Sequence, residues 1–93
     1  MERIVLKFGG TSLGNAEKIL SVAKIIQQKH KSGAEMLVVV SAMSGVTNDL
    51  IEKSKKISSD FEDAELDTLL SSGEQASSAL VAGALVKLGI KSR

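Results

Sequence analysis

The first patterned segment of the chain, Arg3 to Phe8, has an alternating pattern in which every second residue, Ile4, Leu6 and Phe8, is apolar. Ile4 and Val5 are β-branched, and β-branched residues favour extended backbone. The pattern therefore predicts a strand, and the glycine, threonine and serine residues that follow Phe8 predict where it ends.

A helical spacing comes next. Asn15 is a favourable N-cap residue, and the apolar positions after it recur at intervals of three and four, with lysine and glutamine between them. We expect an amphipathic helix that ends near Ser32 and Gly33. Its apolar positions are Ile19, Val22, Ala23 and Ile26.

Met36 to Val40 is an uninterrupted apolar run rich in valine, which is typical of a strand covered on both faces in a parallel sheet. A strand, a helix and a strand in this order predict a βαβ unit. In an open α/β sheet, ligands bind beyond the carboxyl ends of the strands. The two loops that leave those ends are therefore the candidate sites.

The second half of the chain is predicted to be mainly helical. After a loop rich in serine and glycine, Asn48 is expected to cap a helix that carries Leu50, Ile51 and Ile57. Serine and glycine residues predict a break between two further helices, and Gly89 predicts the end of the second. The expected ranges are 41–48 for the loop, 58–63 for a polar connector, 64–70 and 76–88 for the two helices, and 90–93 for the start of a third strand.

Composition narrows the class of protein. With 43% hydrophobic and 25% charged residues, the chain is typical of a soluble α/β domain or of part of one. A net charge of +1 with scattered basic residues disfavours a nucleic-acid partner, and the lack of cysteine excludes a disulfide framework and a thiolate zinc site. No apolar run approaches the ~20 residues that span a bilayer, and we expect no signal peptide, because the strand pattern starts directly after Met1 and Glu2. We expect a cytoplasmic protein without a membrane segment.

The candidate chemistry lies where Lys7 precedes Gly9 and Gly10. Glycine lets backbone N–H groups approach a phosphate closely, and Lys7 adds a mobile cation. The spacing from Gly9 to Gly14 matches a P-loop, but asparagine and alanine follow where lysine and serine or threonine are required. The glycine spacing also differs from the dinucleotide-binding fingerprint. These mismatches disfavour a P-loop enzyme and a Rossmann dehydrogenase.

Three motifs stand in the order expected of one known family. Lys7 to Ser12, Val40 to Asn48 and Ser72 to Glu74 resemble the motifs of aspartokinases, which are members of the amino acid kinase family, and the resemblance extends over essentially all 93 residues. It implies the amino acid kinase (carbamate kinase-like) fold. That fold is an α/β fold with a mainly parallel sheet in a three-layer α/β/α sandwich, here truncated.

The resemblance also implies an activity. Aspartokinases use ATP and Mg²⁺ to phosphorylate the side-chain carboxylate of L-aspartate, which gives 4-phospho-L-aspartate on the way to lysine, threonine and methionine. The residues implied to hold the ATP phosphates are Lys7, Gly9, Gly10, Thr11 and Ser12, with Lys7 as the catalytic cation. Those implied to face aspartate are Ser41, Thr47 and Glu74. No residue is assigned to a metal.

Other interpretations stay open. A lysine and a glycine pair alone also fit acetylglutamate kinase, glutamate 5-kinase and uridylate kinase, although the loop that ends in Thr47 and Asn48 favours aspartokinase. A bare sheet edge is instead typical of a non-enzymatic fragment that self-associates.

The resemblance covers less than half of the family's catalytic domain. Residues 1–93 are expected to form its N-terminal part, without the remainder that binds the nucleotide and without the regulatory domains. We therefore expect the isolated chain to be inactive as a kinase. We also expect it to form a homo-oligomer or to pair with the missing half of the kinase domain.

Overall fold

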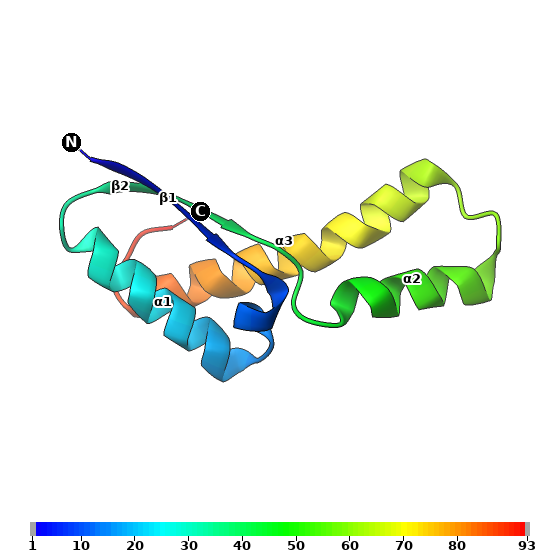
Figure 1. The fold of residues 1–93 in the computed structure, drawn as a ribbon, viewed down its shortest axis with the longest axis horizontal. Coiled ribbons are helices and arrows are strands. Elements are labelled where there is room, and N and C mark those ends of the chain that lie inside the picture. The colour runs from blue at the N-terminus through cyan, green and yellow to red at the C-terminus, as the bar shows by residue number, and fades with distance from the viewer. Residues whose placement is uncertain (1, 93) are drawn as a thin grey trace.

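The computed structural model describes residues 2–92, which form an elongated α/β structure (Figure 1). The strands β1 and β2 pair in parallel, with Arg3 opposite Glu35 and Phe8 opposite Val40. The predicted βαβ unit is therefore confirmed. In chain order, the elements are β1 (Arg3–Phe8), the short 3-10 helix η1 (Gly10–Leu13), α1 (Ala16–His30), β2 (Glu35–Val40), α2 (Val46–Ile57) and α3 (Asp63–Lys87).

The first helix begins and ends close to where its sequence pattern indicates. The Asn15 side chain caps α1, because its Oδ1 accepts a hydrogen bond of 2.9 Å from the Lys18 backbone N–H. The helix ends at His30, shortly before the expected Ser32 and Gly33. A polar side chain in the right place therefore satisfies one of the backbone donors that a helix start leaves without a partner.

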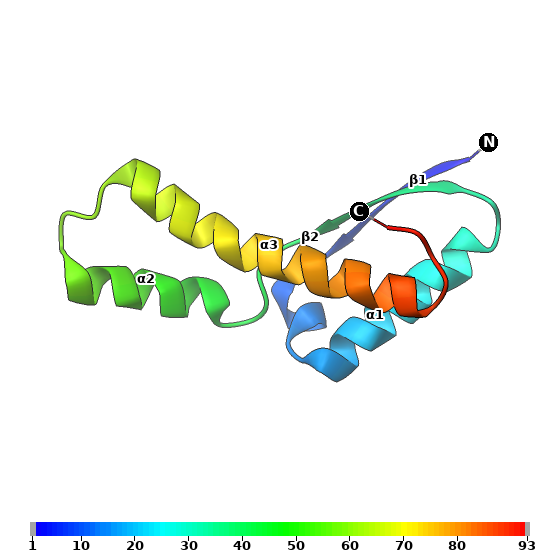
Figure 2. The same cartoon turned by 180° about the vertical axis from the view of Figure 1, so that it is seen from behind.

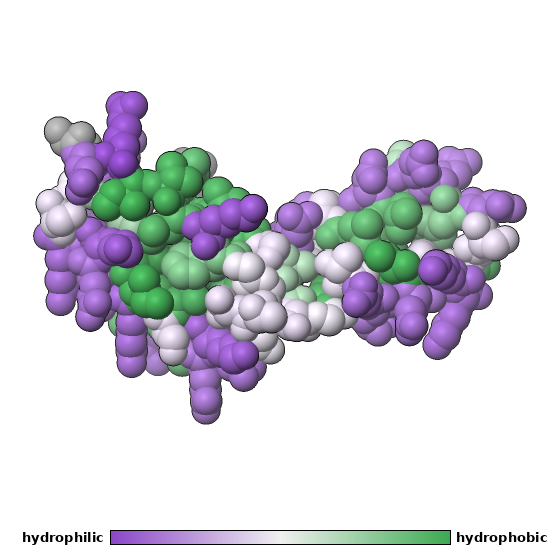
Figure 3. Space-filling view, viewed as in Figure 1, coloured by the Kyte–Doolittle hydropathy of each residue, from purple (hydrophilic) through white to green (hydrophobic). Residues whose placement is uncertain are grey.

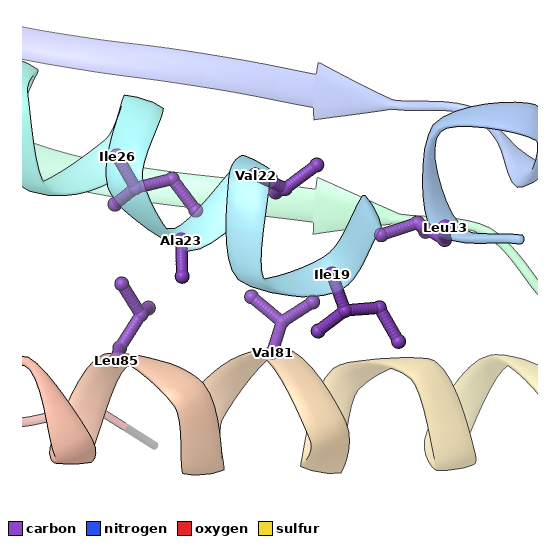
Figure 4. Close-up of a cluster of buried hydrophobic side chains, with 7 residues drawn as sticks. All are labelled: Leu13, Ile19, Val22, Ala23, Ile26, Val81 and Leu85. Carbon is purple, nitrogen blue, oxygen red and sulfur yellow. The ribbon is translucent and has the colours of Figure 1, made fainter. Parts of the chain in front are cut away.

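One hydrophobic core joins the sheet to two helices. In Figure 4, Ala23 of α1 points toward Val81 and Leu85 of α3, and Leu13 of η1 lies at the end of the cluster. Leu13 and Ala23 are fully buried. One face of the sheet packs against this cluster through Leu6, Phe8, Met36, Val38 and Val40. The buried members of the cluster are Leu13, Ile19, Val22, Ala23, Ile26, Val81 and Leu85.

The opposite face of the sheet is open. Val5 and Leu37 lie opposite each other across the two strands and are 68% and 61% exposed, and Val39 beside them is also exposed. The expectation that β2 is covered on both faces is therefore wrong for residues 2–92. The strand has apolar side chains for two covered faces, but α1 and α3 pack on only one of them. The chain holds the sheet and one helical layer of an α/β/α sandwich.

Helix α2 and residues 63–72 of α3 form an antiparallel helical arm that extends away from the sheet, as Figure 2 shows from behind. The molecule measures 50 × 26 × 17 Å along its principal axes. Ser54 is the only buried residue that the structure places in α2. In Figure 3, apolar surface remains visible between the charged side chains of the arm.

Three predictions for the second half of the chain are wrong. Asn48 does not cap α2, because the helix already begins after Gly45, whose φ of 83° is left-handed and favours glycine. Residues 71–74 do not interrupt a helix, since α3 is continuous from Asp63 to Lys87. Residues 90–92 form no strand, and Arg93 lies outside the described residues.

The helix end before Gly89 is confirmed, and the connector between α2 and α3 spans residues 58–62. Although α3 has 25 residues, no helix in the described part of the chain combines the length and the apolar character that crossing a membrane requires.

Candidate functional site

The loop after β1 carries the first motif. The Ser12 backbone N–H donates to the Gly9 carbonyl oxygen at 3.1 Å, which forms the first turn of η1. A Cβ atom placed on Gly9 would meet no other atom within 4 Å, and Thr11 and Ser12 are exposed. The backbone of this loop is therefore accessible to a ligand such as a phosphate group.

Lys7 stands at the carboxyl end of β1, opposite Val39 on the open face of the sheet. Its side chain is exposed and forms no ion pair with any other residue in the range 2–92. Because no carboxylate within this range pairs with it, the ammonium group remains available to an anion at the adjacent loop.

The loop after β2 packs directly against the loop after β1. The Ser41 N–H donates to the Phe8 carbonyl oxygen at 3.3 Å, and the Ser44 N–H donates to the Gly10 carbonyl oxygen at 3.1 Å. A Cβ atom on Gly10 would lie only 2.8 Å from the Ala42 carbonyl oxygen, a distance that real Cβ atoms do not reach. The two loops can therefore meet in this way only with glycine at position 10.

Gly73 brings the third motif to the same place. A Cβ atom on Gly73 would lie 3.2 Å from the Ala42 Cβ and 3.0 Å from the Val46 Cγ1, so α3 approaches both residues closely. Glycine inside a helix costs about 1 kcal/mol relative to alanine. The close packing at Gly73 offsets this cost, which explains why α3 continues where the local sequence predicts a break.

The three motifs therefore meet around Ala42, which is buried. Gly10 approaches it from the loop after β1, and Gly73 approaches it from α3. Two glycines that lie 63 residues apart in the sequence therefore approach the same residue, Gly10 at the Ala42 carbonyl oxygen and Gly73 at the Ala42 Cβ.

The residues expected to face aspartate flank this meeting point. Ser41 directly precedes Ala42 and is half-buried. Thr47 and Glu74 are both exposed, Thr47 in the first turn of α2 and Glu74 one residue beyond Gly73 in α3. The structure thus places these three side chains on three segments that meet where Gly73 packs against Ala42 and Val46. Their roles remain predictions.

The sequence pattern alone does not reveal one residue that lies near the site. The Lys18 ammonium group donates to the Thr11 carbonyl oxygen at 3.1 Å, so a side chain of α1 holds the phosphate-binding candidate loop. The helical pattern places Lys18 only at a polar position. The contact depends on the turn from η1 into α1, which that pattern does not specify.

Two hollows differ in their relation to the motifs. The larger, of about 480 Å³, lies between β2 and the second half of α3 and has mainly apolar walls, among them Met36, Val81 and Ile90. The smaller, of about 360 Å³, lies next to the first motif and includes Thr11, Ser12 and Lys18. Three residues of the first motif, Phe8, Thr11 and Ser12, therefore line the smaller hollow.

Comparison with known proteins decides the family. The model of the amino acid kinase family matches residues 2–93. The chain belongs to the amino acid kinase family. Within it, the chain is 49% identical over 90 residues to an aspartate kinase of Stutzerimonas stutzeri and 45% identical over 89 residues to an aspartokinase of a Bacillus species. These alignments include 97% and 96% of the chain but only 22% of each relative.

A solved structure agrees with the sequence comparison. Aspartate kinase from Synechocystis superposes with a TM-score of 0.89 at 44% identity, over 92% of this chain and 15% of that one. The expected partial amino acid kinase fold and the resemblance to aspartokinases are therefore confirmed. This amino acid kinase chain spans about a fifth of the length of its curated relatives.

Proposed function

We propose that this chain provides the phosphate-binding and aspartate-binding segments of an aspartate kinase. The meeting of the three motifs around Ala42, through Gly10 and Gly73, supports the proposal most directly. The residues proposed to bind the ATP phosphates are Lys7, Gly9, Gly10, Thr11 and Ser12. Those proposed to bind L-aspartate are Ser41, Thr47 and Glu74.

The proposed reaction moves the γ-phosphoryl group of ATP to the side-chain carboxylate of aspartate, giving ADP and 4-phospho-L-aspartate. A free aspartate side chain has a pKa of about 3.9, so the nucleophile is already ionised at neutral pH and needs no general base. Lys7 and the N–H groups of the loop after β1 would position the phosphoryl group and stabilise its developing charge. Catalysis would therefore rest on orientation and electrostatics.

Recognition of aspartate would come from α2 and α3, close to where these two helices meet. Glu74 would pair with the α-ammonium group, and the Thr47 hydroxyl would donate a hydrogen bond to a carboxylate. The helices that carry these two side chains are in contact at Gly73 and Val46. The separation of the two proposed aspartate contacts therefore depends on that packing.

Mg²⁺ enters this proposal as the partner of the ATP phosphates. Among residues 2–92, no group of three or more histidine, cysteine, aspartate or glutamate side chains lies close enough to hold a metal ion. In phosphoryl-transfer enzymes, Mg²⁺ is usually held by substrate phosphates, water and one or two carboxylates. We assign no protein ligand and no step to the ion.

We further propose that the isolated chain is inactive and that the rest of an amino acid kinase domain completes the site. The open face of the sheet, with Val5 and Leu37 largely exposed, supports a further covering layer. Appreciable aspartate-dependent ADP release by the 93-residue chain alone would contradict this proposal.

A chimera tests the proposed activity. Residues 1–93 replace the matching segment of the aspartate kinase from Pseudomonas putida, to which the chain is 46% identical over 90 residues. We expect ADP release with aspartate and none with glutamate, N-acetylglutamate or UMP. Lys7→Met should lower kcat by about 100-fold or more, since groups that stabilise transition-state charge contribute on this scale.

Lys24→Met is the matched control, because Lys24 is an exposed lysine of α1 outside the motif segments. Its kcat should equal that of the parent chimera. A folded chimera that turns over another acceptor but not aspartate would refute the assignment of substrate.

A further inference from the structure

We infer that Lys18 is a positioning residue for the phosphate-binding loop, an inference that rests on the proposed function where it concerns ATP. Two hydrogen bonds support it. The Lys18 backbone N–H donates to the Asn15 side chain at 2.9 Å, and its ammonium group donates to the Thr11 carbonyl oxygen at 3.1 Å. A single residue thus ties the start of α1 to η1.

The Lys18 side chain follows the loop instead of extending into solvent. A Cβ atom on Gly14 would lie 3.7 Å from the Cδ and the Nζ of Lys18, and also 3.7 Å from the Thr11 carbonyl oxygen. The stem of the lysine therefore passes beside Gly14 on its way to Thr11. Holding a long side chain in one path costs rotamer entropy, and the charge-assisted hydrogen bond at its end offsets this cost.

Peptide planarity extends the effect of this contact. The Thr11 carbonyl and the Ser12 N–H belong to one planar peptide unit and point in opposite directions. Lys18 holds the carbonyl, and the Gly9 carbonyl oxygen accepts from the N–H at 3.1 Å. Both ends of this peptide unit are therefore fixed.

The hydrogen bond from Ser12 links this unit to a second peptide unit, the one between Gly9 and Gly10. Because the Gly9 carbonyl is directed at Ser12, the trans peptide directs the Gly10 N–H away from η1. The Gly10 carbonyl on the other side accepts from the Ser44 N–H, which anchors the loop a second time. Lys18 thereby sets, through two peptide units, the direction of an N–H group proposed to meet a phosphate.

Hydrogen exchange in the full 93-residue chain tests the positioning role without requiring kinase activity. In Lys18→Met, a peptide covering residues 9–14 should exchange about three- to tenfold faster, as expected for the loss of one exposed charge-assisted hydrogen bond. Lys18→Arg should restore exchange to within about twofold, because arginine also offers a charged N–H donor. Lys24→Met, on the same helix, should leave this peptide unchanged.

Steady-state kinetics of the chimera test the link to the nucleotide. Lys18→Met should raise the KM for ATP about three- to tenfold, keep kcat within about twofold and leave the KM for aspartate unchanged. Unchanged exchange in Lys18→Met would overturn the positioning role, even with a higher KM, because the lysine would then act as a direct charge on ATP. Faster exchange with an unchanged KM would overturn the role in nucleotide binding.

The two hypotheses fail separately. A parent chimera without aspartate-dependent activity would count against the proposed function. The exchange measurement on the unfused chain would still decide whether Lys18 positions the loop.

Discussion

The sheet end of the molecule and the helical arm differ in how many apolar side chains each of them buries. At the sheet end, α1, the second half of α3 and one sheet face enclose a cluster whose most exposed buried members, Ile19 and Leu85, are only 5% exposed. In the arm, Ser54 is the only buried residue of α2 within the described chain, and Ile57 is 78% exposed. The sheet end therefore has a core of its own, whereas the arm depends on its attachment.

This difference separates the two halves of the proposed site. The loop after β1 lies at the sheet end, next to the buried Leu13. Thr47 and Glu74 lie at the base of the arm, where the packing of Gly73 against Val46 joins α2 to α3. Regions with few buried apolar contacts open at a lower free energy. The proposed phosphate site is thus built on the firmer part, whereas two of the three proposed aspartate contacts, Thr47 and Glu74, depend on how the base of the arm packs.

The largest expected effect comes from removing apolar volume in the two regions. Ile26 is 2% exposed in the core and Ile57 is 78% exposed in the arm. Ile26→Ala should lower the free energy of unfolding by about 2 to 5 kcal/mol, because it leaves a cavity. Ile57→Ala should change it by no more than about 0.5 kcal/mol. Urea denaturation of both variants measures the difference, and equal losses would show that the arm carries a core of its own.

A second pair of variants tests the contact between the two loops. Gly10→Ala would force a Cβ atom to within 2.8 Å of the Ala42 carbonyl oxygen, and a backbone atom cannot move aside easily. Overpacking of this kind costs about 1 to 3 kcal/mol in the free energy of unfolding. Gly9→Ala adds its Cβ to open space and should be close to neutral for stability.

Gly10→Ala and Gly9→Ala can also be compared for activity. In the chimera, Gly10→Ala should lower aspartate-dependent turnover, because it displaces the loop after β1. Thermal denaturation gives the stability of each variant. If Gly10→Ala unfolded at the same temperature as Gly9→Ala, the close approach of the two loops would not be a feature of the protein in solution.

A third comparison uses two glycines of α3. Gly83→Ala should raise the free energy of unfolding by about 0.5 to 1 kcal/mol, since alanine favours the helix and its Cβ would meet nothing within 4 Å. Gly73→Ala gains the same helix propensity but places a Cβ at 3.0 Å from Val46 and 3.2 Å from Ala42. We expect a net loss of about 1 to 2 kcal/mol, because the cost of overpacking exceeds the gain.

Hydrogen exchange of α2 provides the control for this comparison. If Gly73 joins the arm to the sheet end, Gly73→Ala should speed exchange in α2 more than in α1. A stabilising effect of Gly73→Ala would mean that Val46 can move aside at little cost, and the arm would then be attached less tightly than its geometry indicates.

The sequence predicts the sheet end better than the arm, for a physical reason. Alternation in Arg3 to Phe8 and the three-and-four spacing after Asn15 are local signals, and burial in one core reinforces them. In the second half, Gly73 signals a break by its own propensity. Its contacts with Ala42 and Val46, distant in sequence, reverse that outcome.

The candidate site also has a part that the sequence predicts and a part that it does not. Residues of the three motifs can be named from the sequence, because their types and order resemble those of a known family. The sequence does not predict that the motifs meet around Ala42, because an alanine side chain has no functional group that would indicate such a role. The Lys18 contact is equally hidden, because it depends on the direction of one carbonyl group in η1.

The smallest expected effect compares two asparagines that look alike in the sequence, since each precedes a helical pattern. Asn15 accepts a hydrogen bond from the Lys18 N–H and caps α1, whereas Asn48 lies inside α2 and is exposed. Asn15→Ala should lower the free energy of unfolding by about 1 kcal/mol, because a helix N–H loses its partner. Asn48→Ala should raise it by a few tenths of a kcal/mol, about the difference in helix propensity. Opposite signs in urea denaturation would place the start of α2 directly after Gly45, whereas equal losses would mean that Asn48 caps the helix and that α2 begins after it.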